Sequence, residues 1–157
     1  MQKILNISGL LVVTAWVGGM WGVGYLAVPV LFLSLPDKML AGMLAGKMFT
    51  LVAYVGIISA SYLLLVNLAN SGMAALRLTL FRVTGAMLLL TLVTHFGIHP
   101  VMEDLKAQAF PDDIRLSAYA ARFDTLHHVA SFLYVLQSLL GIVLVLQTRH
   151  HDSRAQL

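Results

Sequence analysis

The 157-residue sequence contains no cysteine. This absence excludes a disulfide framework, a thiolate metal site and catalysis by a thiol. Charge is also scarce, because only 11% of the residues are Asp, Glu, Lys or Arg. The formal net charge is +3, but the basic residues are scattered along the chain. A nucleic-acid-binding protein would gather them on one face, so we expect no nucleic-acid partner.

Recognisable catalytic motifs are missing too. No nucleophile stands in a pattern with a base and an acid, and no glycine-rich phosphate loop follows a strand pattern. The first apolar run lacks the embedded acidic residue that small proton-coupled drug exporters use. The sequence therefore favours a protein without enzymatic activity.

Long apolar runs, by contrast, dominate the chain. Hydrophobic residues make up 59% of it, and the mean hydropathy is +0.86. Four runs cover residues 4–33, 46–69, 78–98 and 129–147. A helix of about 20 apolar residues crosses a hydrocarbon layer of about 30 Å. We predict one all-α domain over residues 1–157, an integral membrane four-helix bundle whose partner is the lipid bilayer.

Proline and turn residues mark the ends of these runs. Pro29 predicts a kink in the first helix or its exit from the membrane, and Asp37 suits the N-cap of the second helix. A residue before proline avoids the α region, so the third helix is expected to end or bend at His99, before Pro100. Residues 101–125 are then expected to form the one substantial segment outside the membrane.

The charge distribution bears on orientation. An even number of spans places both termini on one side of the membrane. Five of the ten basic residues fall on that side and five on the other, so the positive-inside rule gives no decision. Six of the seven acidic residues fall on the side away from the termini. This leaves a slight bias toward cytoplasmic termini in a bacterial inner membrane.

Small residues four apart predict packing faces. Gly18 and Gly22 have this spacing in the first run, as do Gly42 and Gly46 at the start of the second. Such pairs let helix backbones approach closely in lipid. On the fourth helix the corresponding face consists of His127, Ser131, Tyr134, Ser138 and Gly141. We expect these faces to turn inward, and a homodimer through the same glycines is the alternative.

The histidines form the most unusual group of side chains. His95, His99 and Glu103 follow at intervals of four and share one helix face. His127 opens the fourth helix at a similar depth. Three interpretations stay open. The histidines are structural and bonded to carbonyls or carboxylates; or they bind zinc or copper, with Glu103 or His127 as the third ligand; or His95 and His127 hold a haem b from facing helices.

Several stretches resemble a known family. They are residues 16–25, 28–32, 45–49, 122–123 and 126–131. These stretches are similar to those of small four-span bacterial membrane proteins related to eukaryotic transmembrane protein 205, which are grouped under a domain of unknown function. The resemblance covers nearly the whole chain and implies a four-helix membrane protein. It carries over no catalytic residue.

The leading functional expectation is a membrane protein that moves or senses a small ligand at its histidine-bearing side. One alternative is a haem- or copper-handling protein, in the manner of the copper-resistance CopD-type domain or the HemJ-type protoporphyrinogen oxidase. Both of those families have four spans and use histidines near span ends. A second alternative is a structural or interaction subunit of a larger membrane complex.

Overall fold

The computed structural model describes the backbone of residues 2–154 and the side chains of residues 7–148. Every element in this range is helical, which confirms the all-α prediction. The elements are α1 (Gln2–Trp21), η1 (Gly22–Ala27), α2 (Val28–Ser34), α3 (Lys38–Ser71), η2 (Gly72–Arg77), α4 (Thr79–Leu92), η3 (Val93–Ile98), α5 (His99–Ala109), η4 (Ile114–Leu116) and α6 (Ala120–Arg154). Of the short elements, η1 and η3 are π-helical, and η2 and η4 are 3₁₀-helical.

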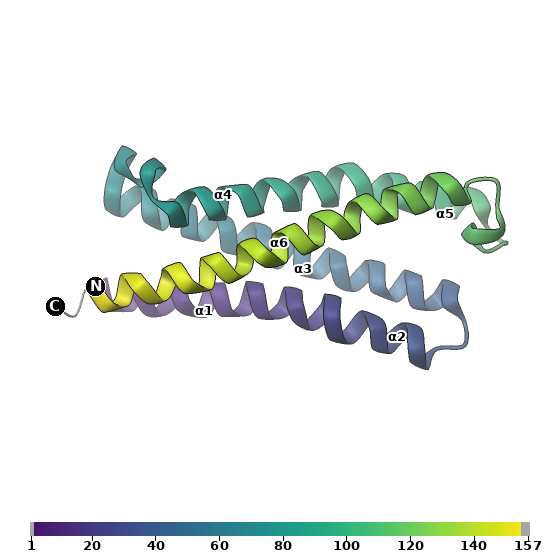
Figure 1. The fold of residues 1–157 in the computed structure, drawn as a ribbon, viewed down its shortest axis with the longest axis horizontal. Helices are drawn as coiled ribbons and strands as arrows, with labels where there is room; N and C mark the ends of the chain where they lie inside the picture. The colour runs from purple at the N-terminus through teal and green to yellow at the C-terminus, as the bar shows by residue number, and fades with distance from the viewer. Residues whose placement is uncertain (1, 155–157) are drawn as a thin grey trace.

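These elements join end to end into four rods. The rods are Ile7–Ser34, Lys38–Arg77, Thr79–Ala109 and Ala120–Thr148, each long and apolar enough to cross a membrane. They alternate in direction, so the start of α1 and the end of α6 lie at one end of the molecule (Figure 1). The connections α2–α3 and α5–α6 lie at the opposite end, called the loop end below. The chain is therefore a multi-pass membrane protein built as a four-helix bundle.

The bundle is tight near its middle and opens toward the loop end. Its main core packs large side chains of α1, α4 and α6, with Trp16, Met87 and Leu144 at most 1% exposed. A smaller cluster of Met102, Leu105 and Phe123 ties α5 to α6. In Figure 1, α2 and the start of α3 diverge from α5 and α6. This divergence leaves the space in which the candidate site lies.

The connection before α3 is fixed by a helix cap. One carboxylate oxygen of Asp37 accepts hydrogen bonds from the backbone N–H groups of Met39, at 2.9 Å, and Leu40, at 3.0 Å. These bonds satisfy donors that have no partner within the helix. The predicted N-cap is confirmed, and α3 begins at Lys38, eight residues before the second apolar run.

The third rod does not end at His99, so the first of the two alternatives predicted there, an end or a bend, is wrong. The π turn η3 leads directly into α5, which continues to Ala109. Proline lacks a backbone N–H, and a π turn just ahead of it shifts the hydrogen-bond register so that the helix can continue. The first rod continues through Pro29 in the same way, because η1 also ends two residues before the proline. The predicted extramembrane segment therefore begins as helix, and the chain breaks only at Phe110.

The glycines of the second and fourth rods lie at helix contacts, as expected. A Cβ placed on Gly141 would lie 3.2 Å from Cγ1 of Val17. One on Gly42 would lie 3.9 Å from the Phe32 ring, and one on Gly46 would lie 3.4 Å from Oε1 of Glu103. Close approach depends on the missing side chain at Gly141, whereas an added carbon on Gly42 would make an ordinary van der Waals contact.

The first rod packs differently from the prediction. A Cβ on Gly18 or Gly22 would meet no atom of another element within 4 Å, and Gly18 is exposed. The inward orientation predicted for Gly18 is wrong, whereas Tyr25, which was expected on the same face, does line the space between the rods. The large side chains Trp16, Val17 and Met20 occupy the inner face of α1 instead. A homodimer through Gly18 and Gly22 stays a prediction.

Candidate functional site

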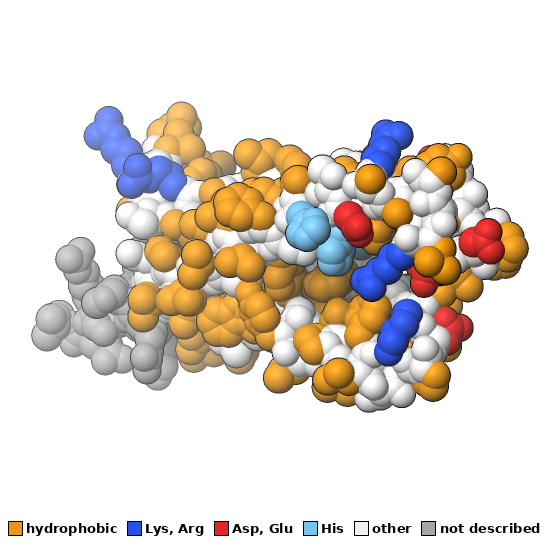
Figure 2. Space-filling model, turned by 45° about the vertical axis from the view of Figure 1, so that its right-hand side comes forward, with side chains coloured by type: hydrophobic (Ala, Val, Ile, Leu, Met, Phe, Trp, Pro, Cys, Tyr) orange, Lys and Arg blue, Asp and Glu red, His pale blue; other side chains and the backbone are white. Residues whose placement is uncertain are grey.

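A cavity of about 430 Å³ lies where the four rods separate, and side chains from all four rods line it. Figure 2 shows a hollow in the half of the molecule away from the termini, with histidine, basic and acidic side chains around it. The surface between this region and the terminal end is largely hydrophobic. The unusual polar residues of the chain are therefore gathered around one internal space.

All four residues singled out from the sequence, His95, His99, Glu103 and His127, line this cavity. The ring centroids of His95 and His99 lie 6.3 Å apart. Aromatic rings of α3 contact both histidines edge-on. The Tyr54 ring lies 5.1 Å from that of His95, and the Phe49 ring lies 6.5 Å from that of His99.

The inner end of the cavity is closed by polar pairs that join neighbouring rods. The Tyr25 hydroxyl donates to Oγ of Ser138 at 3.0 Å, and the Tyr134 hydroxyl donates to a backbone carbonyl of α1. The side-chain amide of Gln137 donates to Oγ1 of Thr91 at 2.8 Å. Because these polar atoms already have partners in the protein, the inner end mainly offers aromatic and methyl surface to a ligand.

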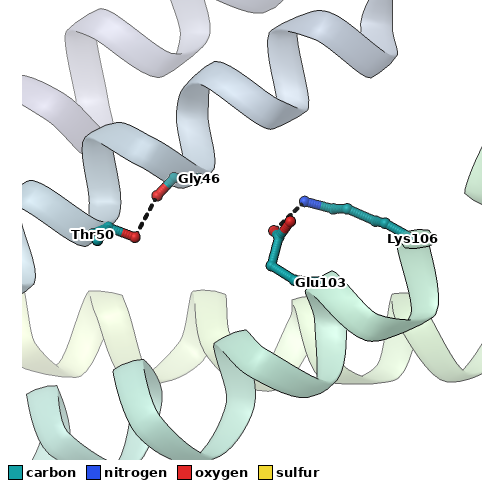
Figure 3. Close-up of polar contacts among 4 residues, drawn as sticks. All are labelled: Gly46, Thr50, Glu103 and Lys106. Atoms are coloured by element: carbon teal, nitrogen blue, oxygen red, sulfur yellow. Dashed lines mark hydrogen bonds and ion pairs between the residues drawn. The ribbon is translucent and has the colours of Figure 1, made fainter.

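The outer end of the cavity carries charged side chains. Nζ of Lys106 lies 2.7 Å from Oε1 of Glu103 (Figure 3) and 5.8 Å from the centre of the Phe123 ring. Phe123 in turn stacks on His127, with ring centroids 6.1 Å apart and planes 11° from parallel. These contacts link α5 and α6 across the outer end and hold the His127 ring in position.

Two further charged residues, Arg115 and Asp124, line the same outer end. Neither side chain makes an ion pair or a hydrogen bond with any other side chain or backbone group in the part of the chain that the structure describes. The outer end therefore holds one positive and one negative group that are available to a ligand.

The described side chains do not form a metal centre. Zinc needs several ligands at about 2.0–2.3 Å from the ion, and no three His, Cys, Asp or Glu side chains stand close enough for this among the described residues. The histidine–histidine ring contacts join His95 to His99 and His127 to His128. His95 and His127 both line the cavity, and the haem alternative that pairs them stays a prediction.

Sequence reasoning missed part of the site. Gln137 carried a signal, because a polar side chain inside an apolar run needs a buried partner. Its partner Thr91 could not be chosen from the sequence, since several rods offer hydroxyl groups. Arg115 gave no signal at all, because it comes from a loop whose position depends on tertiary structure.

The fold and this cavity together define the class of protein: a four-span membrane protein with an internal, partly polar cavity. Residues 11–111 match a family described as a domain of unknown function, DUF4149, and the chain belongs to this family. The matched segment includes most of the first rod, all of the second and third rods, and the cavity residues His95, His99 and Glu103. No curated protein and no solved structure matches the chain.

Proposed function

We propose that this protein binds a small ligand in the cavity between its spans and moves it, or reports its presence, at the loop end. The observation that carries the proposal is the cavity itself, because it is lined from all four rods. Ligand pockets in proteins typically enclose about 300–1,000 Å³ of mostly apolar surface with a few polar groups. A volume of about 430 Å³ lies within that range.

The proposal extends to the location of the protein. We place it in the inner membrane of a bacterium, with both termini in the cytoplasm and the outer end of the cavity on the opposite side. The uneven distribution of acidic residues supports this orientation. The sequence likeness to proteins related to transmembrane protein 205 supports a role shared with that group.

The test compares two tryptophan substitutions on α6. Ser131 lines the cavity, whereas Val129 is 44% exposed and does not line it. Membranes containing each variant are extracted directly into polymer-bounded nanodiscs, and the retained small molecules are identified by mass spectrometry. We expect at least one compound enriched over the surrounding membrane in the wild type and in Val129→Trp, and lost in Ser131→Trp. If nothing is enriched, or if both variants retain the same compounds, the cavity is not a ligand site.

A further inference from the structure

Only a thin wall of shared residues separates the cavity from the outer surface between α3 and α5. A groove on the outside of these helices is lined by Met43, Gly46, Lys47, Thr50, Leu51, His99 and Glu103. Three of these residues, Gly46, His99 and Glu103, also line the cavity. Leu51 is 66% exposed and Met43 is 47% exposed, so apolar side chains border the groove beside the exposed Lys47. The cavity therefore adjoins an outer surface between α3 and α5 as well as the loop end.

Few contacts hold α3 and α5 together at this wall. No hydrogen bond or ion pair joins α3 to α5 among the side chains that the structure describes. The Thr50 hydroxyl donates back to the Gly46 carbonyl, and the Glu103–Lys106 pair lies within α5 (Figure 3). The Glu103 carboxylate lies in the space that a side chain on Gly46 would approach. The ion pair therefore does not link the two helices, and an exposed pair of this kind gains little net free energy.

The lining of the cavity changes from apolar to charged along its length. The middle is lined by apolar and aromatic side chains, among them Phe32, Phe49, Val52 and Val135. The outer end offers Arg115 and Asp124, which have opposite charges and lack partners among the described residues. A matching ligand has an apolar body and a head that carries one negative and one positive group. The guanidinium of arginine is well suited to the two oxygens of a phosphate.

We propose that the ligand is a single-chain amphiphile with a zwitterionic head, and that it enters from the bilayer between α3 and α5. This inference rests on the proposed function, because it needs the cavity to be a ligand site. The hydrocarbon chain lies along the aromatic middle of the cavity, the phosphate faces Arg115, and the ammonium faces Asp124.

The experiment uses the absence of native cysteine. Gly46→Cys and Glu103→Cys place one thiol on each of the two helices at the wall between α3 and α5, and a short thiol-specific cross-linker bridges them. The protein is reconstituted in vesicles of phosphatidylethanolamine and phosphatidylglycerol that contain lysophosphatidylethanolamine with a photoreactive diazirine on its chain. After illumination, mass spectrometry of peptides locates the attached probe.

We expect the probe on cavity residues such as Phe49 and Ala53 in the wild type and in the unbridged variant. Bridging should lower this labelling at least fivefold, while labelling of the lipid-facing Phe132 stays unchanged. Gly46→Leu, which thickens the wall without a cross-link, should also lower it. A probe with only a phosphate in its head, lysophosphatidic acid, should label the cavity at least threefold less.

Three results would overturn the inference. Equal cavity labelling with and without the bridge would exclude the side entrance. Wild-type labelling confined to lipid-facing residues such as Phe132 would exclude an amphiphile as the ligand. Equal cavity labelling by the two probes would exclude selection for a zwitterionic head. None of these three results contradicts the proposed function if Ser131→Trp still loses a compound in the nanodisc experiment. Failure of this inference can therefore be distinguished from failure of the proposed function.

Discussion

At the scale of single residues, glycine occurs where an aromatic side chain packs directly against a helix backbone. A Cβ on Gly56 would lie 2.6 Å from Nε1 of Trp16, a residue that is only 1% exposed. Gly24 lies against the hydroxyl end of the Tyr134 ring in the same way. Neither belongs to a pair of glycines at the four-residue spacing, although Gly56 and Ala60 are small residues four apart. The close contact at each glycine is made by an aromatic side chain of another helix.

Gly56→Ala is expected to lower the free energy of unfolding by about 1–3 kcal/mol, the usual cost of forcing extra atoms into a packed interior. The matched control is Gly18→Ala, whose added methyl group meets no other element within 4 Å. This control should be neutral or gain up to about 1 kcal/mol from helix propensity. Both are measured by titrating detergent-solubilised protein with sodium dodecyl sulfate. Equal effects of the two substitutions would contradict the packing at Trp16.

The candidate site could be predicted only where its residues are close in sequence. His95, His99 and Glu103 share a face because the spacing of four keeps residues together on a helix, and all three line the cavity. The contributions of Arg115 and Phe49 depend on how separate rods pack, which local spacing does not determine. The exposure of Gly18 was missed for the same reason, because the sequence does not distinguish a glycine pair that faces inward from one that faces outward.

At the scale of helices, the first and third rods share one backbone feature, a π turn just before a proline. Both run from the terminal end toward the loop end, and each has a six-residue π turn, then one residue, then proline. Both turns contribute to the cavity wall, η1 through Gly24 and Tyr25 and η3 through Thr94 and His95. The sequence predicted an interruption at each proline. It could not predict the π turn, because the missing N–H says nothing of how the neighbouring backbone compensates.

The hydrogen bond between Gln137 and Thr91 joins α6 to α4 at the inner end of the cavity. A double-mutant cycle with Thr91→Val and Gln137→Leu should give a coupling free energy of about 0.6 kcal/mol, and about 1.7 kcal/mol at most, the values found for such bonds between membrane helices. The free energies of unfolding come from thermal or denaturant unfolding in lipid bicelles. Strictly additive effects would show that this bond does not stabilise the pair of helices.

At the scale of the whole molecule, the alternating rods fix which connections share a side of the membrane. Ser71 lies at the terminal end and Asp112 at the loop end, and both are exposed. We expect a membrane-impermeant maleimide to label Asp112→Cys in intact cells and Ser71→Cys only after the membrane is permeabilised. Labelling of both from one side would contradict the four-span topology. The reverse order would contradict only the proposed orientation.

The four-helix architecture itself was predictable, because the length and apolar character of the runs depend on the hydrocarbon core and not on packing. The ends of the helices were less predictable. The cap at Asp37 was found from its chemistry, but the third rod continues through Pro100 to Ala109, well beyond the apolar run. Apolar length predicts where a membrane can lie along a helix, not where the helix stops.

The rods are much longer than a membrane is thick. The 34 residues of α3 extend over about 50 Å at a rise of about 1.5 Å each, against about 30 Å of hydrocarbon. Such an excess is absorbed by tilt, by local thickening of the lipid or by helix ends standing in water. The depth at which the gap beside Gly46 meets acyl chains or headgroups therefore varies with the host bilayer. Lipids with longer tails would submerge that gap and shorter ones would lift it toward the surface, which makes membrane thickness a natural regulator of access to the interior.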